Sequence, residues 1–171
     1  HKRGSTQDIA TKLHVRSGFL NHPVAVGSVA DPAVMPAVFA VGAVRADGYL
    51  TNDVEPFSSW GPTSAGVVKP DIAGPDGIST DAYGGRGFYG TSAATPAVTG
   101  ALALLMSEDP SLGPYEAARK LQALAIRTDV SFVEPDPRWG AGKAYLPGYI
   151  RRQVGCGERP LAMWLLWVPV G

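Results

Sequence analysis

Gly90-Thr91-Ser92-Ala93-Ala94-Thr95-Pro96-Ala97-Val98-Thr99-Gly100 is the stretch on which the interpretation of this chain rests. Glycine and threonine come just before the serine, a proline follows four residues after it, and a second glycine four residues later. At average residue usage, a given window matches five such fixed residues by chance about once in 10⁶. The pattern is therefore specific, and the analysis of the rest of the sequence starts from it.

The residues after Ser92 predict a buried helix with that serine at its amino end. Residues 93–106 contain no charged residue, and apolar residues occur on every side of the projected helix. Because a helix that is apolar all round is buried, we expect it to cross the centre of the domain, with Pro96 in or near its first turn. Ser92 then lies beside unpaired backbone N–H groups, which stabilise a developing oxyanion. A plain helix-capping role is the alternative for the serine taken alone.

The longer pattern resembles the serine motif of the subtilisin-like serine peptidases (subtilases), in which the matching serine is the nucleophile. Other segments resemble the family in its own order. They are the strand-like Val38–Val44, the Phe-Ser-Ser-Trp-Gly-Pro loop at 57–62, the Lys-Pro-Asp segment at 69–77, the helix at 115–125 and Gly140-Ala141-Gly142. In the Lys-Pro-Asp segment the family usually has alanine where this chain has Gly74. The resemblance spans roughly residues 24–145 and implies a three-layer subtilisin-like α/β fold with a mainly parallel sheet.

The coarse pattern of elements agrees with an α/β fold. We expect helices at 8–20 and from Pro114, strands at 24–27 and 39–44, a short buried segment at 71–73 and a turn at Gly84-Gly85. Strands that alternate with helices favour a parallel sheet covered on both faces. We expect residues 1–145 to be the C-terminal part of a subtilase catalytic domain, incomplete and with one sheet edge exposed.

Residues 146–171 are expected to form a tail outside that domain. Residues 161–170 are ten consecutive apolar residues, too few to span a bilayer, which needs about 20. A buried strand, a contact patch for another chain or segment, and a non-native end all remain open for this stretch.

The family uses an aspartate and a histidine that precede the serine, each followed by a characteristic glycine-containing motif. Neither motif occurs here, and His1, His14 and His22 are followed by lysine, valine and proline. We interpret these histidines as surface or turn residues. The aspartate and histidine are expected from an upstream segment, so the chain alone should be close to inert.

The family's second oxyanion donor is an asparagine that follows Ala-Gly at the end of a buried strand. Residues 24–28 read Val-Ala-Val-Gly-Ser, so Ser28 stands at that position as a weak candidate donor. A serine hydroxyl can donate, but it is shorter than the asparagine side chain and must rotate. The resemblance implies that substrate contacts Ala25, Val26, Gly27, Gly90 and Thr91.

The sequence thus predicts a serine endopeptidase that cleaves extended peptides by acyl transfer through Ser92. The alternative is an inactive subtilase-like fold that binds a peptide or a partner chain, including the other half of the domain. Fifteen basic and fifteen acidic residues give no electrostatic case for nucleic acid or an anionic membrane, and no membrane span is predicted.

No cofactor or metal site is predicted. The acidic residues do not form a loop with calcium-ligand spacing, although many subtilases bind calcium. The lone Cys156 cannot form an intrachain disulfide. A secreted or extracytoplasmic location is implied by the resemblance alone.

Overall fold

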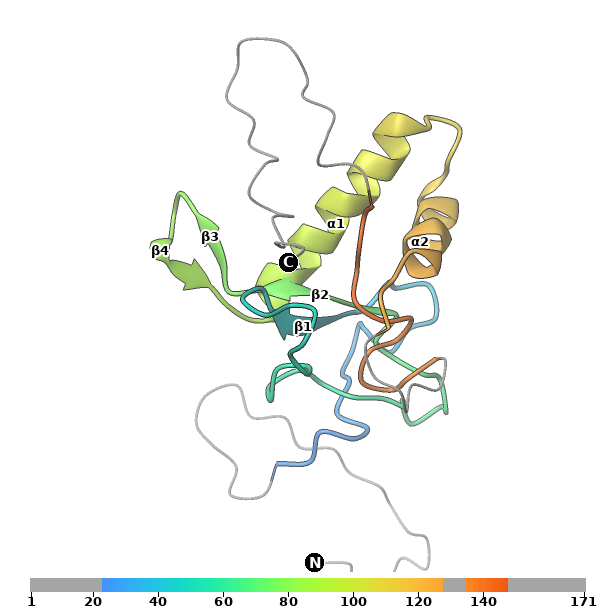
Figure 1. The fold of residues 1–171 in the computed structure, drawn as a ribbon. Helices are drawn as coiled ribbons and strands as arrows, with labels where there is room; N and C mark the ends of the chain where they lie inside the picture. The colour runs from blue at the N-terminus through green and yellow to red at the C-terminus, as the bar shows by residue number, and fades with distance from the viewer. Residues whose placement is uncertain (1–22, 128–134, 148–171) are drawn as a thin grey trace, which may run out of the picture.

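A pair of parallel strands lies at the centre of the fold in the computed structural model (Figure 1). The structure describes residues 23–127 and 135–147. β1 (Val41–Arg45) and β2 (Ile72–Asp76) pair along their whole length, so that Arg45 lies opposite Asp76. Both strands are largely buried and rich in small and branched apolar residues, which is typical of parallel strands covered on both faces.

A later segment continues the sheet beyond β2. The N–H of Ala73 donates to the carbonyl of Gly142 at 2.9 Å, and the N–H of Ala144 donates to the carbonyl of Ala73 at 2.8 Å. Lys143 between them forms a parallel bridge with Ala73 and an antiparallel bridge with Ile126. The closing glycine segment of the sequence therefore lies beside β2 as a third strand-like segment of this sheet.

The other edge of the sheet is covered by the chain that follows β1. The N–H of Glu55 donates to the carbonyl of Ala43 at 2.8 Å, and the N–H of Ala43 donates to the Ser58 hydroxyl at 3.1 Å. The prediction of an exposed sheet edge is therefore wrong at Ala43, where a local loop satisfies both backbone groups.

Two helices cover one face of the sheet. α1 (Thr91–Glu108) and α2 (Pro114–Ala123) lie on the same side of β1 and β2 in Figure 1. Leu105 of α1 and Leu121 of α2 are fully buried in one apolar cluster with strand residue Ile72. The predicted helix from Pro114 is thus confirmed, as is the α/β class of the fold.

Loops, rather than helices, cover the opposite face in the described part of the chain. A second apolar cluster lies there, formed by Val44, Tyr49, Val54, Ala73 and Trp139. The helix expected at 8–20, which could add a layer, lies outside the described residues, as do Cys156 and the apolar tail 161–170.

α1 differs from its prediction in two respects. Val98 and Leu105 are buried, but Thr95 and Leu104 are exposed, so the described chain covers only one side of this apolar helix. Pro96 is the sixth residue of α1, beyond the first turn. Because proline has no N–H, the carbonyl of Ser92 lacks its usual donor four residues later.

The strand predicted at 24–27 is also wrong. Val26 forms one isolated bridge with Trp60, and the pairing does not continue into a ladder of several residues. Val24 and Val26 are 72% and 57% exposed. Gly27 then turns the chain with a φ of 71°, so the apolar run ends before it can extend a sheet.

A hairpin leads from β2 to the amino end of α1. β3 (Ile78–Thr80) pairs antiparallel with β4 (Gly84–Phe88). Gly84 and Gly85 begin β4, so the predicted turn lies just before them, at 81–83. The hairpin forms a two-stranded sheet of its own, separate from the β1–β2 sheet.

Candidate active site

Ser92 is the second residue of α1, and its side chain is exposed. The helix begins after Gly90, whose φ of 108° is a conformation that favours glycine. The N–H groups of Ala93 and Ala94 both donate to the Gly90 carbonyl, at 2.8 and 3.2 Å. Within the described part of the chain, the N–H groups of Thr91 and Ser92 have no acceptor. These donors lie at the positive end of the helix dipole, where an oxyanion would be stabilised.

The buried carboxylate of Asp76 holds Gly90, two residues before Ser92. Asp76 ends β2 and is 0% exposed, and its Oδ2 accepts the Gly90 N–H at 2.9 Å. Asp76 had no predicted role. The signal was nevertheless present, since an acidic residue ends an otherwise uncharged apolar strand.

Ser28 does not present a free hydroxyl. Its Oγ donates to the Ala25 carbonyl at 2.5 Å and accepts the Trp60 N–H at 3.3 Å. A serine hydroxyl has one proton, so Ser28 cannot donate to an oxyanion while this contact lasts. Its oxyanion role remains a prediction, and in this structure Ser28 holds the 25–28 turn against the loop at Trp60.

One edge of the segment expected to bind substrate is occupied. The Trp60 N–H donates to the Ala25 carbonyl at 3.1 Å, and the Gly27 N–H donates to the Gly61 carbonyl at 3.3 Å. The N–H and carbonyl of Val26 have no partner among the described residues. An extended peptide that paired with this segment would therefore use Val26.

The Lys-Pro-Asp segment forms a structural ion pair. Lys69 is 2% exposed, and its Nζ donates to the Val38 carbonyl at 2.6 Å and to Asp71 Oδ2 at 2.7 Å. The same carboxylate oxygen accepts the Ala40 N–H at 2.6 Å. A buried ammonium requires such partners, and these fix the start of β2 against the chain that leads into β1.

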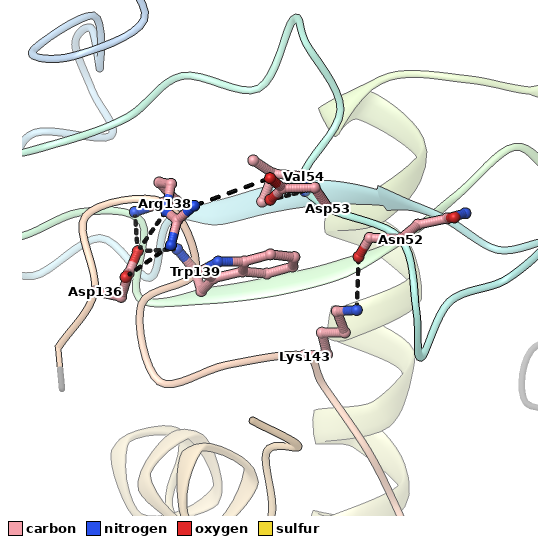
Figure 2. A network of polar contacts seen from close by, with 7 residues as sticks. All are labelled: Asn52, Asp53, Val54, Asp136, Arg138, Trp139 and Lys143. Carbon is pink, nitrogen blue, oxygen red and sulfur yellow. Dashed lines mark hydrogen bonds and ion pairs between the residues drawn. The ribbon is translucent and has the colours of Figure 1, made fainter. Parts of the chain in front are cut away.

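A second buried lysine lies on the loop-covered face (Figure 2). Lys143 Nζ donates to the carbonyls of Leu50 and Asn52, at 3.0 and 2.7 Å, and lies 4.9 Å from the centre of the Trp139 ring. Burial lowers the pKa of Lys143 to about 8, against the opposing effect of the Asp53 charge. The sequence analysis missed this lysine, whose contacts come from a loop about 90 positions earlier.

Figure 2 shows a carboxylate that closes the turn before Lys143. Asp136 Oδ1 accepts the backbone N–H groups of Arg138 and Trp139, at 2.7 and 3.3 Å. Arg138 Nη1 also lies 3.9 Å from Asp53 Oδ2. These contacts join the loop after β1 to the segment that extends the sheet, so the polar cluster is structural.

The described residues bear on only some of the remaining predictions, which concern the histidines, a metal site and a membrane span. All three histidines lie outside the described residues. In residues 23–127 and 135–147, no group of three or more histidine, cysteine, aspartate or glutamate side chains is arranged to hold a metal ion. Over the same residues, no helix has the length and apolar character that crossing a membrane requires.

Comparison with known proteins gives a family match over most of the chain. The model of the Subtilase family matches residues 19–157. The serine protease AprX of Bacillus subtilis (strain 168) is 32% identical over 136 residues, which cover 67% of this chain and 30% of AprX. Subtilisin-like protease SBT3.16 of Arabidopsis thaliana is 40% identical over 88 residues, 48% of this chain and 12% of that protein. The chain thus spans less than a third of the length of these relatives.

Solved structures agree with the family match. The CspB protease of Clostridium perfringens is 29% identical, with a TM-score of 0.63 over 72% of this chain and 28% of that one. Sphericase is 28% identical, with a TM-score of 0.57 over 71% of this chain and 44% of that one. From the fold, the serine at the amino end of α1 and these matches, we conclude that the chain belongs to the subtilase family of serine proteases.

Proposed function

We propose that the chain carries the nucleophile of a serine endopeptidase, and that this nucleophile is Ser92. One observation carries the proposal: Ser92 is exposed at the amino end of α1, beside its own N–H and that of Thr91, which have no acceptor in the described chain. Membership of a serine protease family supports the reaction class. The substrate would be a peptide or protein chain.

In this reaction the Ser92 Oγ attacks a peptide carbonyl while a general base takes its proton. The Ser92 N–H stabilises the oxyanion that forms, and the amine leaves with a proton from the same base. Water then hydrolyses the acyl-enzyme and regenerates the serine. We propose that the histidine base and its aspartate come from a part of the catalytic domain outside these 171 residues.

A second candidate function is an inactive subtilase-like fold that binds a peptide or partner chain. The Ser28 contact supports it, because the hydroxyl at the family's asparagine position donates to Ala25 instead of pointing freely. Loss of that donor costs about 10²–10³ in turnover in a subtilisin, the system from which this figure comes. An extended peptide would then bind without being cleaved.

Labelling with a fluorophosphonate separates the two functions. The reagent would be applied to the full-length protein and to the 171-residue chain, with mass spectrometry to locate the adduct. Ser92→Ala is the direct control, and Ser107→Ala, at the exposed carboxyl end of the same helix, is the matched control. We expect an adduct on Ser92 in the full-length protein that only Ser92→Ala abolishes. A folded full-length protein without the adduct would support the binding function.

A further inference from the structure

The turn that carries Ser92 begins at Gly90, a residue with no side chain that could fix its conformation. Gly90 is the N-cap of α1 and has no side chain with which to cap the helix. Its φ of 108° is open to glycine, but the same freedom makes the position costly to fix. Something outside the helix has to hold Gly90 if Ser92 is to keep one orientation.

Asp76 supplies that contact from the neighbouring strand. Its own backbone is fixed, because its carbonyl accepts the Ala46 N–H at 2.9 Å and it lies opposite Arg45 in the β1–β2 pairing. From there its Oδ2 accepts the Gly90 N–H at 2.9 Å. Hydrogen bonds to a charged acceptor are stronger than neutral ones, and a negative charge is favourable near a helix amino end.

The contact continues into the first turn of the helix. The Gly90 carbonyl accepts the N–H groups of Ala93 and Ala94, so both backbone polar groups of Gly90 are bonded. Ser92 lies between these anchors, and its carbonyl lacks the usual donor because residue 96 is proline. The orientation of the Ser92 peptide therefore depends on Gly90 more than it would in a regular helix.

The burial of Asp76 also has a cost for stability, in spite of the favourable contact with Gly90. The side chain is 0% exposed, and its second oxygen, Oδ1, has no hydrogen-bond partner among the described residues. A buried acceptor without a partner destabilises a fold, and such groups in native structures call for another explanation. Proteins tolerate local costs of this kind mainly at functional sites.

We propose that Asp76 is a positioning residue for Ser92: its carboxylate holds the Gly90 N–H and so fixes the turn that presents the nucleophile. The proposal rests on the proposed function of Ser92. Asp76 does not touch the substrate or the reacting atoms. It acts through Gly90.

The test compares three variants of the full-length protein. Asp76→Ala removes the acceptor, and Asp76→Asn keeps an amide oxygen that can accept the Gly90 N–H. Asp71→Asn is the matched control, because Asp71 precedes the same strand and holds Lys69 and Ala40 instead. Two quantities are measured: hydrogen–deuterium exchange of the Gly90 N–H, and the rate of fluorophosphonate labelling at Ser92.

Asp76→Ala should speed exchange of the Gly90 N–H by about 10- to 100-fold, as loss of a hydrogen bond to a charged group predicts. The N–H groups of Thr91 and Ser92 have no acceptor in the described chain, so their exchange should change little. Asp76→Ala should also slow labelling of Ser92 about 10-fold or more. Asp76→Asn should lie between wild type and Asp76→Ala in both measurements, because the acceptor is kept but its charge is lost. Asp71→Asn weakens the contacts of Lys69 and Ala40 and lowers overall stability, but it should change both quantities less than Asp76→Ala does.

Unchanged exchange in Asp76→Ala would overturn the proposal. So would equal slowing of labelling in Asp76→Ala and Asp71→Asn, which would show only a general loss of stability. If the wild-type protein is not labelled at all, the proposed function fails instead. The exchange measurement then decides alone whether Asp76 holds Gly90.

Discussion

Gly74 lies where α1 packs closely against β2. A Cβ added at Gly74 would lie 2.7 Å from Val98 Cγ2 and 2.9 Å from the backbone oxygen of Ala94. The subtilase pattern usually has alanine here, so this helix lies closer to its strand than an alanine allows. We expect Gly74→Ala to lower the free energy of unfolding by about 1–3 kcal/mol, the usual effect of overpacking. Urea denaturation measures the change.

Gly100 provides the matched control on the same helix. A Cβ at Gly100 would meet nothing within 4 Å, and its backbone is helical. Gly100→Ala should therefore leave stability unchanged or raise it by up to about 1 kcal/mol, through helix propensity. Equal destabilisation by both substitutions would contradict the close approach at Gly74.

Lys143 makes stability depend on pH. Its pKa is about 8 in the folded protein against an ordinary value of 10.5. Between these values the unfolded chain binds a proton that the folded chain does not, so stability should rise with pH, by at most about 1.4 kcal/mol per pH unit. Below pH 8 both states are protonated and the contribution no longer changes. Urea denaturation at intervals from pH 7 to 10 would show this rise.

Lys143→Met tests the assignment of that pH dependence. Methionine keeps the length of the side chain and its packing against Trp139 but does not titrate. The rise in stability between pH 8 and 10 should shrink in this variant. A slope identical to that of wild type would mean that another group causes it.

At single residues, the sequence predicted Ser92 as the nucleophile because its motif is contiguous, and this role stays a prediction. Asp76 and Lys143 were missed because their contacts, with Gly90 and with the 50–52 loop, join positions 14 and more than 90 residues apart. Ser28 was placed by analogy with an asparagine. Sequence could not show that its proton goes to Ala25.

Among the elements, α1 carries an internal proline whose cost can be measured. Pro96→Ala would restore an N–H that can donate to the Ser92 carbonyl, and Pro96 itself is exposed. We expect the free energy of unfolding to rise by about 1–3 kcal/mol, up to the cost of proline in a helix interior. Thermal unfolding followed by circular dichroism would show this increase. A lower midpoint would indicate that the proline ring makes packing contacts that alanine loses.

The elements that the sequence predicted well are those set by local pattern. α2 follows from Pro114 and the helical spacing of Ala118 and Leu121. The 24–27 segment has an equally apolar pattern, yet a strand also needs a neighbour along its length. Only Trp60 pairs with it in the described chain. Pairing is a non-local property, so an apolar run alone could not decide it.

On the scale of the whole molecule, the described surface carries several exposed apolar side chains. They include Val24, Val26, Phe57 and Leu104, with exposed fractions from 37% to 72%. Association with another protein segment would bury this apolar area, which is favourable. We expect the 171-residue chain, expressed alone, to self-associate at micromolar concentration.

Sedimentation velocity over a dilution series measures this self-association. Leu104→Lys, on the exposed side of α1, should weaken association of the isolated chain without altering its helical circular dichroism. A monomeric wild-type chain over the whole series would contradict the expectation.

The strand-like segment at residues 141–144 also affects when the sheet can be completed during synthesis. The Tyr49 hydroxyl donates to the Ala144 carbonyl, 95 positions later in the chain. At about 5–20 residues per second, the ribosome adds Ala144 about 5–20 s after Tyr49. Until then β2 has no neighbour on that side, and the Lys143 contacts to the 50–52 loop are absent. A nascent chain must therefore carry an open sheet through that interval, in which a chaperone would have its best opportunity to bind.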